Sequence, residues 1–196
     1  MIQKKKSKGL SFAQRKKGID ISIIRKISIW VVEIIIVIVI AATLSYFVGL
    51  QSSVVGKSMA PTLDAGDEIL INRFSYKLTD PKTNDLIVFL PNGNEKSHYY
   101  IKRVIAVPGE TVQIKDGQVY VNGKPFEEEI EVDPIENAEL AAEEILLEND
   151  EYFVLGDNRN NSEDSRYANI GNVKSEHIIG KAWFCISPGN KIGKIK

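Results

Sequence analysis

The chain has 196 residues, of which 43% are hydrophobic and 26% are charged, and these proportions suit one globular domain with an extension. Its single cysteine, Cys185, excludes an intramolecular disulfide. His98 and His177 belong to no cluster with the spacing of metal ligands. We therefore expect no metal and no cofactor, and we expect no nucleic-acid partner.

The net charge of −1 hides two blocks of opposite sign. Residues 1–26 contain nine Lys or Arg and one Asp, whereas Glu127–Glu151 contains twelve Asp or Glu and no Lys or Arg. A block of like charges is usually a solvated surface, and that is our interpretation of the acidic block.

Residues 27–50 predict a transmembrane helix. Ile34–Leu50 contains no charged residue, and Glu33 is the one charged residue before it in this stretch. At about 1.5 Å per residue, a helix of this length can cross a hydrocarbon core of ~30 Å. Trp30 lies near one end and Tyr46 near the other, as in an interfacial aromatic belt.

Three alternatives to an anchor are open. A cleaved signal peptide has a shorter basic region than residues 1–26, and an interfacial helix needs a polar face. A buried core helix is the third, but an apolar surface on every side fits lipid better. Because positive residues stay inside, we expect residues 1–26 in the cytoplasm and residues 51–196 outside the cell membrane, with the lipid bilayer as a partner.

Residues 51–196 predict a mainly β domain of barrel or sandwich type. Runs of β-branched and aromatic residues alternate with Gly, Pro, Asn and Asp, and Asp116-Gly117 and Asn122-Gly123 have the composition of tight turns. The expected strands are Glu68–Asn72, Leu86–Leu90, Tyr100–Val107, Thr111–Lys115, Gln118–Val121, Tyr152–Leu155 and Lys181–Ile186.

The acidic block interrupts this pattern. Ala138–Leu147 is rich in Glu, Ala and Leu, which predicts a helix. We expect residues 127–151 to form a small, partly helical insertion on the surface, between two strands.

Two polar segments of the domain suit an active site, although each has an ordinary structural explanation. Gly56 and Pro61 favour a bend that would expose Ser58, but a linker turn has the same composition. Gly156–Arg166 offers hydroxyls, carboxylates and guanidiniums that could orient a base, but a solvated loop is also polar.

A third segment is the expected strand Tyr100–Val107. Alternation places Lys102 and Arg103 on opposite faces, and both faces are otherwise apolar, so one of these cations lies near apolar packing. A desolvated lysine has a lowered pKa and can act as a general base, which arginine cannot. Alternation does not say which cation is buried, and a lysine that reaches water at a sheet edge is the alternative.

Together, these segments resemble the bacterial type I signal peptidases, in the Gram-positive form with one anchor. The matching runs are Ser-Met-x-Pro-Thr-Leu at 58–63, Tyr-Ile-Lys-Arg-Val at 100–104 and Gly-Asp-Asn-Arg-x-Asn-Ser-x-Asp-Ser-Arg at 156–166, together with the strand at 66–71. The resemblance implies a membrane-anchored serine endopeptidase with a Ser-Lys dyad. Its reaction would be the removal of signal peptides from exported preproteins after an Ala-x-Ala-type site.

The resemblance also implies roles for single residues. Ser58 would be the nucleophile, Lys102 the base, and Ser162 the residue that orients the lysine amine. The Ser58 N–H would be one oxyanion donor, but Gly56 stands where many members have a Ser or Thr that supplies another. Ser165 is a neighbouring hydroxyl that the motif register does not favour. The ion pairs around the site would come from Arg103, Asp157, Asp164 and Arg166.

The matched substrate pockets would have shallow apolar walls that accept only small side chains. The residues concerned are Val54, Met59, Leu63, Ile69, Tyr100 and Ile101. The implied partners are secreted preproteins, and the secretion translocon is a further candidate. Ser58 follows Leu50 by eight residues, so it lies within ~28 Å of the expected helix even in an extended chain.

Two other functions are open. A self-cleaving serine–lysine repressor shares the chemistry but would need a DNA-binding domain and an internal Ala-Gly cleavage site. A non-enzymatic, anchored β domain is the second, but inactive relatives of peptidases usually lose the nucleophile or the base, and both are present here.

Overall fold

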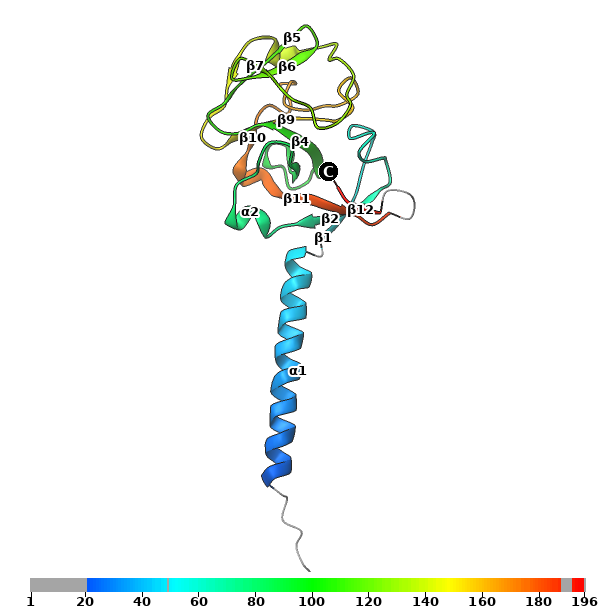
Figure 1. Cartoon of the computed structure of the whole chain (residues 1–196), viewed down its shortest axis with the longest axis vertical. Coiled ribbons are helices and arrows are strands. Elements are labelled where there is room, and N and C mark those ends of the chain that lie inside the picture. The colour runs from blue at the N-terminus through cyan, green and yellow to red at the C-terminus, as the bar shows by residue number, and fades with distance from the viewer. Residues whose placement is uncertain (1–20, 49, 188–191, 196) are drawn as a thin grey trace, which may run out of the picture. The chain divides into compact units, whose positions relative to one another are not determined.

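The computed structural model describes residues 21–48, 50–187 and 192–195, in two compact units, Met1–Ala42 and Thr43–Lys196. The first element is the helix α1 (Ile21–Val48), drawn in blue and cyan in Figure 1. Within the described ranges, none of the helices meets the combined requirement of length and apolar character for a membrane span. Most of the predicted basic segment, residues 1–20, lies outside the described residues.

The rest of the chain forms two antiparallel sheets. The strands of the larger sheet are β1 (Leu50–Ser53), β2 (Glu68–Asn72), β3 (Leu86–Phe89), β4 (Tyr100–Ala106), β9 (Glu151–Leu155), β10 (Val173–Lys174), β11 (Ile178–Cys185) and β12 (Gly193–Lys194). Their order is β1-β2-β11-β3-β4-β9-β10, and β12 pairs with β11. The strands of the smaller sheet are β5 (Thr111–Lys115), β6 (Gln118–Val121), β7 (Lys124–Pro125) and β8 (Ile145–Leu146). Their order is β7-β6-β5-β8.

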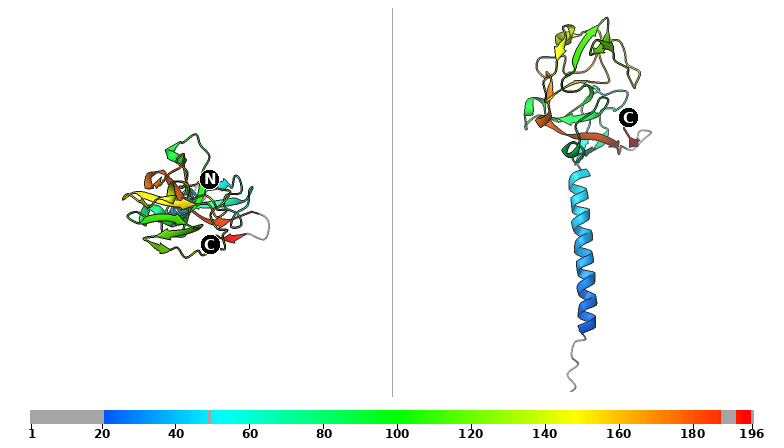
Figure 2. Two further views of the ribbon diagram at one scale, coloured as in Figure 1. Left: turned by 90° about the horizontal axis from the view of Figure 1, so that it is seen from above. Right: turned by 60° about the vertical axis from the view of Figure 1, so that its left-hand side comes forward.

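Four short helical turns connect these strands. They are α2 (Ser75–Leu78), η1 (Pro91–Gly93), η2 (Glu139–Ala142) and η3 (Ser175–His177). Figures 1 and 2 show β5, β6 and β7 at one end of the β domain, and β1 and β2 at the other. The domain is therefore mainly β, as predicted.

All seven predicted strands are present, and their ends move by three residues or fewer. Both predicted turns are confirmed. Asp116 and Gly117 have φ of 49° and 77°, and Asn122 and Gly123 have φ of 51° and 72°. These are the positive values that two-residue hairpin turns need.

The predicted helix Ala138–Leu147 is wrong. This segment contains the short turn η2 and the strand β8, which pairs with Thr111 and Val112 of β5. Ala141 and Leu147 are buried in the core under the smaller sheet. Pairing with β5 and burial of these two side chains outweigh the helix propensity of the Glu, Ala and Leu residues, which differs among residues by less than ~1 kcal/mol each.

β4 lies in the middle of the larger sheet, between β3 and β9. Its apolar residues enter three separate core clusters. Ile101 packs with the buried residues around β2, Val104 with those around β3 and β10, and Ile105 with those beneath the smaller sheet. The positions of these three β4 side chains are thus fixed by packing on both faces of the sheet.

Candidate active site

Ser58 lies in the loop between β1 and β2, and packing fixes the loop. Val54 and Asp67 close its base, because Val54 N–H donates to the Asp67 carbonyl at 2.8 Å. Met59 and Leu63 are each 1% exposed and are inserted into the core cluster beside β2. Gly56 has φ of +78°, a left-handed conformation that strains any residue with a Cβ. The loop thus presents Ser58 from a rigid base.

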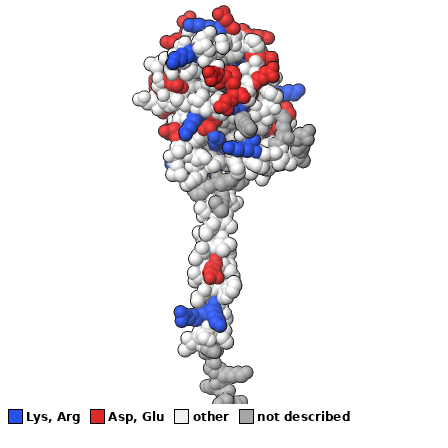
Figure 3. All heavy atoms as spheres, in the orientation of Figure 1, with Lys and Arg blue, Asp and Glu red and all other residues white. Residues whose placement is uncertain are grey.

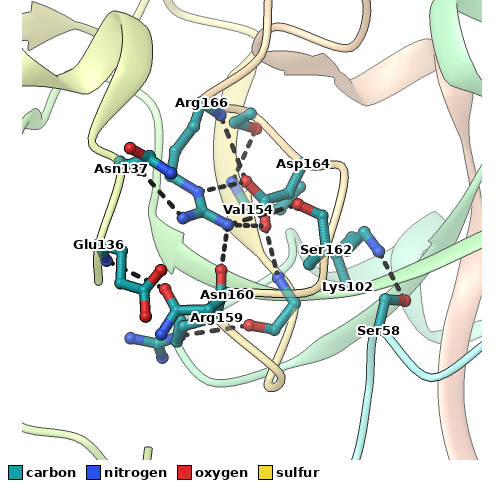
Figure 4. Close-up of polar contacts among 12 residues, drawn as sticks. Ser58, Lys102, Glu136, Asn137, Val154, Arg159, Asn160, Ser162, Asp164 and Arg166 are labelled. Carbon is teal, nitrogen blue, oxygen red and sulfur yellow. Dashed lines mark hydrogen bonds and ion pairs between the residues drawn. The ribbon is translucent and has the colours of Figure 1, made fainter. Parts of the chain in front are cut away.

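Lys102 projects from β4 toward Ser58, and the two side chains are hydrogen bonded (Figure 4). The distance from Lys102 Nζ to Ser58 Oγ is 2.8 Å, and Lys102 is only 3% exposed. Burial lowers the pKa of the Lys102 ammonium to about 8, and the charge of Arg166 acts in the same direction. Asp164, Glu163 and Asp157 oppose this shift because they attract the protonated form. Desolvation outweighs these attractions, so the amine is an available base near neutral pH.

Arg103, the next residue on β4, is buried as well, but it is fully paired. Its Nε and Nη2 donate to the two carboxylate oxygens of Asp157, both at 2.8 Å, and Nη1 donates to the Asn84 carbonyl at 3.1 Å. Thr62 donates its hydroxyl to the same carboxylate at 2.5 Å. The structure therefore answers the question left open by strand alternation. Both cations are buried, and only the arginine has a bidentate carboxylate partner.

The loop that contains residues 156–166 is held by a second bidentate ion pair. Arg166 donates to both oxygens of Asp164, at 2.8 and 3.0 Å, and both side chains are buried. Asp164 also accepts from the Gly156 N–H at 3.0 Å, and Arg166 donates to the Arg159 carbonyl at 2.6 Å. These contacts, drawn in Figure 4, fix the loop beside Lys102. All four predicted ion-pair residues thus lie around the dyad and pair with one another.

Ser162 lies beside Lys102 and Ser58 in Figure 4, but the predicted hydrogen bond from Ser162 to the lysine is not formed in this structure. Its Oγ is buried and has no hydrogen-bond partner among the described residues. Instead, it packs on Gly156, where an added Cβ would lie 2.2 Å from Ser162 Oγ and 2.5 Å from the Ser58 carbonyl oxygen. Ser165 has a structural position, because its hydroxyl accepts from the Val154 N–H at 3.0 Å.

A cavity of about 240 Å³ opens beside the dyad. The residues that line it are Val54, Val55, Ser58, Met59, His98, Tyr99, Tyr100, Ile101, Lys102 and Glu163. Four of the six predicted pocket residues are among them, namely Val54, Met59, Tyr100 and Ile101. The other two, Leu63 and Ile69, are fully buried behind the cavity in the core cluster that includes Val54 and Met59.

The sequence did not reveal the supporting contacts of Arg159, Glu128 and Thr62. Arg159 is 2% exposed and makes a bidentate pair with Glu128 of the acidic block, at 2.5 and 2.7 Å. Thr62 bonds to Asp157 across 95 positions of sequence. Both contacts join distant segments, and nothing in the local pattern of either segment indicates its partner. Within the described ranges, no group of three or more His, Cys, Asp or Glu residues could hold a metal ion.

A seryl hydroxyl bonded to a desolvated amine, at the edge of an apolar cavity, is the arrangement of a serine hydrolase that uses a lysine base. Residues 27–187 match the family described as signal peptidase, peptidase S26. The chain therefore belongs to the signal peptidase family. It is a serine protease of the signal peptidase I type, and its activity is the cleavage of signal peptides from exported proteins.

Individual relatives agree with this family. The chain is 37% identical over 164 residues to a signal peptidase I of Leptolyngbya laminosa, with 81% of this chain and 78% of the relative covered. It is 34% identical over 168 residues to a probable signal peptidase I-1 of Synechocystis, with 83% of each covered. A signal peptidase I of Bacillus licheniformis is 33% identical over 172 residues, with 84% and 91% covered. A crystal structure of a signal peptidase I from Enterococcus faecalis overlaps 53% of this chain and 97% of its own, at 32% identity and a TM-score of 0.42.

Proposed function

We propose that Ser58 and Lys102 are the dyad with which this chain cleaves signal peptides. The observation that carries this proposal is the 2.8 Å hydrogen bond between Lys102 Nζ and Ser58 Oγ beside a cavity. The second support is electrostatic, because Asp157 and Asp164 are each engaged by an arginine and neither forms an ion pair with the lysine amine. Lys102 can then lose its proton at a pH where an exposed lysine would keep it.

Each proton in the proposed reaction moves through Lys102 Nζ. Neutral Lys102 takes the Ser58 hydroxyl proton as Oγ bonds to the scissile carbonyl carbon. When the carbon–nitrogen bond breaks, the same ammonium gives its proton to the leaving amine, and an acyl-Ser58 ester remains. Lys102, neutral again, takes a proton from a water that attacks the ester, and then returns it to Ser58 Oγ. The second product is the signal peptide with a free carboxylate.

The negative charge on the attacked carbonyl oxygen needs hydrogen-bond donors. The Ser58 N–H makes no hydrogen bond among the described residues, so it is available as one oxyanion donor. A donor of this kind is typically worth ~3–4 kcal/mol in the transition state. Gly56 has no hydroxyl, and its positive φ favours glycine, so the second donor is a backbone amide or a water.

The cavity supports cleavage after an Ala-x-Ala-type site. Its walls are apolar at Val54, Met59 and Ile101, and Tyr100 lies alongside them. Val54 and Met59 are held in the core and cannot yield easily, because protein interiors are close-packed. A volume of about 240 Å³ that is shared with the reacting groups accepts small side chains and excludes large ones.

We also propose that α1 anchors the peptidase in the membrane, with residues 1–26 in the cytoplasm and residues 51–196 outside. The family is membrane-bound. The helix has 28 residues, and its apolar side chains from Ile34 to Ile40 are at least half exposed. Figure 3 shows its charged side chains only in the N-terminal half, whereas charges of both signs cover the β domain. Exposed apolar side chains at this density are unfavourable in water, whereas a lipid environment accommodates them.

A preprotein assay on the full chain in detergent tests the dyad. Ser58→Ala should abolish cleavage, whereas Ser53→Ala, an exposed serine on β1, should leave it unchanged. N-terminal sequencing of the wild-type product should show a cut directly after Ala-x-Ala. Cleavage by Ser58→Ala at the wild-type rate would show that another residue is the nucleophile.

A further inference from the structure

Among the described residues that line the active-site cavity, Glu163 is the only Asp or Glu and Lys102 is the only Lys or Arg. The neighbouring Asp164 is buried and pairs with Arg166 (Figure 4), but Glu163 itself is exposed. Within the part of the chain that the structure describes, the Glu163 carboxylate makes no hydrogen bond and no ion pair. Glu163 is thus an exposed anion with no ion-pair partner among the described residues, and its charge acts on Lys102.

The other carboxylates near the dyad differ from Glu163 in this respect. Asp157 is bidentate with Arg103, and Asp164 is bidentate with Arg166, so each buried anion is matched by a buried cation. The two members of each pair largely cancel at larger distances, and at short range Asp164 and Asp157 add to the negative potential that Lys102 experiences. Glu163 has no such partner, and its charge is felt in the cavity.

The charge of the cavity depends on the state of Lys102. When Lys102 is protonated, it balances Glu163. The reaction, however, requires neutral Lys102, and in that state the charge of Glu163 is uncompensated among the lining residues. The catalytically competent cavity is therefore negative at its mouth. A substrate that enters this state meets an attractive potential for cations and a repulsive one for anions.

We propose that Glu163 is a specificity-determining residue, which makes the site favour preproteins with a basic side chain next to the scissile bond and disfavour those with an acidic one. The inference rests on the proposed function of the dyad. An extended substrate points alternate side chains in opposite directions, so the small residues that fill the apolar walls leave their neighbours to face the rim. The side chains at positions −2 and +1 relative to the cut are therefore the ones that approach Glu163.

The effect should be moderate, because Glu163 is exposed to water. Exposed charge pairs typically change an equilibrium by roughly two- to fivefold. Glu163 attracts a lysine of the substrate and repels a glutamate. A substrate with Lys at the position facing Glu163 should therefore have a kcat/KM about tenfold higher than one with Glu there. The other ionisable groups near the mouth are His98, which lines the cavity, and Lys57, which is exposed next to Ser58. The substrates should therefore be compared with one another at a single pH and within each enzyme variant.

The test uses the full-length protein in detergent and one preprotein with Lys, Gln or Glu at position −2, and a second set with the same changes at +1. The quantity to compare is the ratio of kcat/KM for the Lys substrate to that for the Glu substrate. This ratio cancels any change that a variant causes in Lys102 itself, because both substrates use the same base. We expect a ratio of about ten at one of the two positions in the wild type, and a fall as ionic strength rises.

Glu163→Gln should bring that ratio close to one, and Glu163→Lys should invert it. Glu143→Gln is the matched control, because Glu143 is an exposed carboxylate of the acidic block that does not line the cavity. It should keep the wild-type ratio. A wild-type ratio near one at both positions, or a ratio that Glu163→Gln leaves unchanged, would overturn the inference. If the wild-type protein cleaved none of the preproteins, the proposed function itself would fail instead.

Discussion

The low pKa of Lys102 predicts how the rate of cleavage changes with pH. At a pKa of about 8, roughly 10% of the amine is neutral at pH 7, whereas at the ordinary value of 10.5 only ~0.03% would be. Burial of Lys102 therefore raises the population of the reactive form about 300-fold at pH 7. Because neutral Lys102 is the base in the proposed reaction, the rate should rise with pH. Between pH 6 and pH 9, kcat/KM should increase by about 90-fold, with a plateau above pH 9.

The measurement is kcat/KM from pH 6 to about pH 11, with a preprotein that has no ionisable side chain near the cut. This parameter reports the ionisation of the free enzyme, so the midpoint of the rise is the pKa of the base. Circular dichroism at each pH controls for unfolding. A profile that is flat between pH 6 and pH 9 would refute the reasoning, and so would a rise whose midpoint lies near 10.5, because the amine would then not be desolvated.

Three variants test the surroundings of the dyad. Lys102→Met should be inactive, yet its free energy of unfolding at pH 7 should be about 3 kcal/mol higher than that of the wild type, because the folded protein holds the pKa of Lys102 below its unfolded value. The stability that Lys102 contributes is lost as pH falls through about 8, so the advantage of Met should vanish above about 10.5. Denaturant unfolding at several pH values measures this difference. Gly156→Ala should reduce kcat/KM by about 100-fold, because its Cβ would displace the Ser58 carbonyl and Ser162; activity near wild type would show that the loop yields freely. Asp157→Ala leaves the Arg103 guanidinium buried without a counterion, and should cost about 3–5 kcal/mol in the free energy of unfolding. A loss of less than 1 kcal/mol there would mean that water reaches Arg103.

The strands of the domain could be predicted because their residues follow local rules. β-branched and aromatic residues fill β4 and β5, and Asp116-Gly117 has the positive φ that its turn requires. The segment Ala138–Leu147 could not be predicted in this way. Its helix propensity is local, but its conformation depends on pairing with β5, which precedes it by about thirty residues.

The site shows the same division. The two residues of the proposed dyad could be predicted because Ser58 and Lys102 lie in recognisable motifs. The carboxylate partners of Arg103 and Arg159 could not be predicted, because Arg103 and Asp157 are 54 positions apart and Arg159 and Glu128 are 31 apart. Ser162 was placed in the right neighbourhood, but the direction of its hydroxyl depends on how it packs against Gly156, which no sequence pattern describes.

The pairing of Arg103 with Asp157 also protects the alignment of β4. If β4 slipped by one residue along β3, Lys102 and Arg103 would exchange faces, together with the buried apolar residues on either side of them. A guanidinium would then stand next to Ser58, and because it never loses its proton, the molecule would be folded but inert. The slipped strand would also offer Asp157 an ammonium, which cannot match a carboxylate with two parallel bonds. The bidentate pair between Arg103 and Asp157 thus favours the register in which Lys102, and not Arg103, lies next to Ser58.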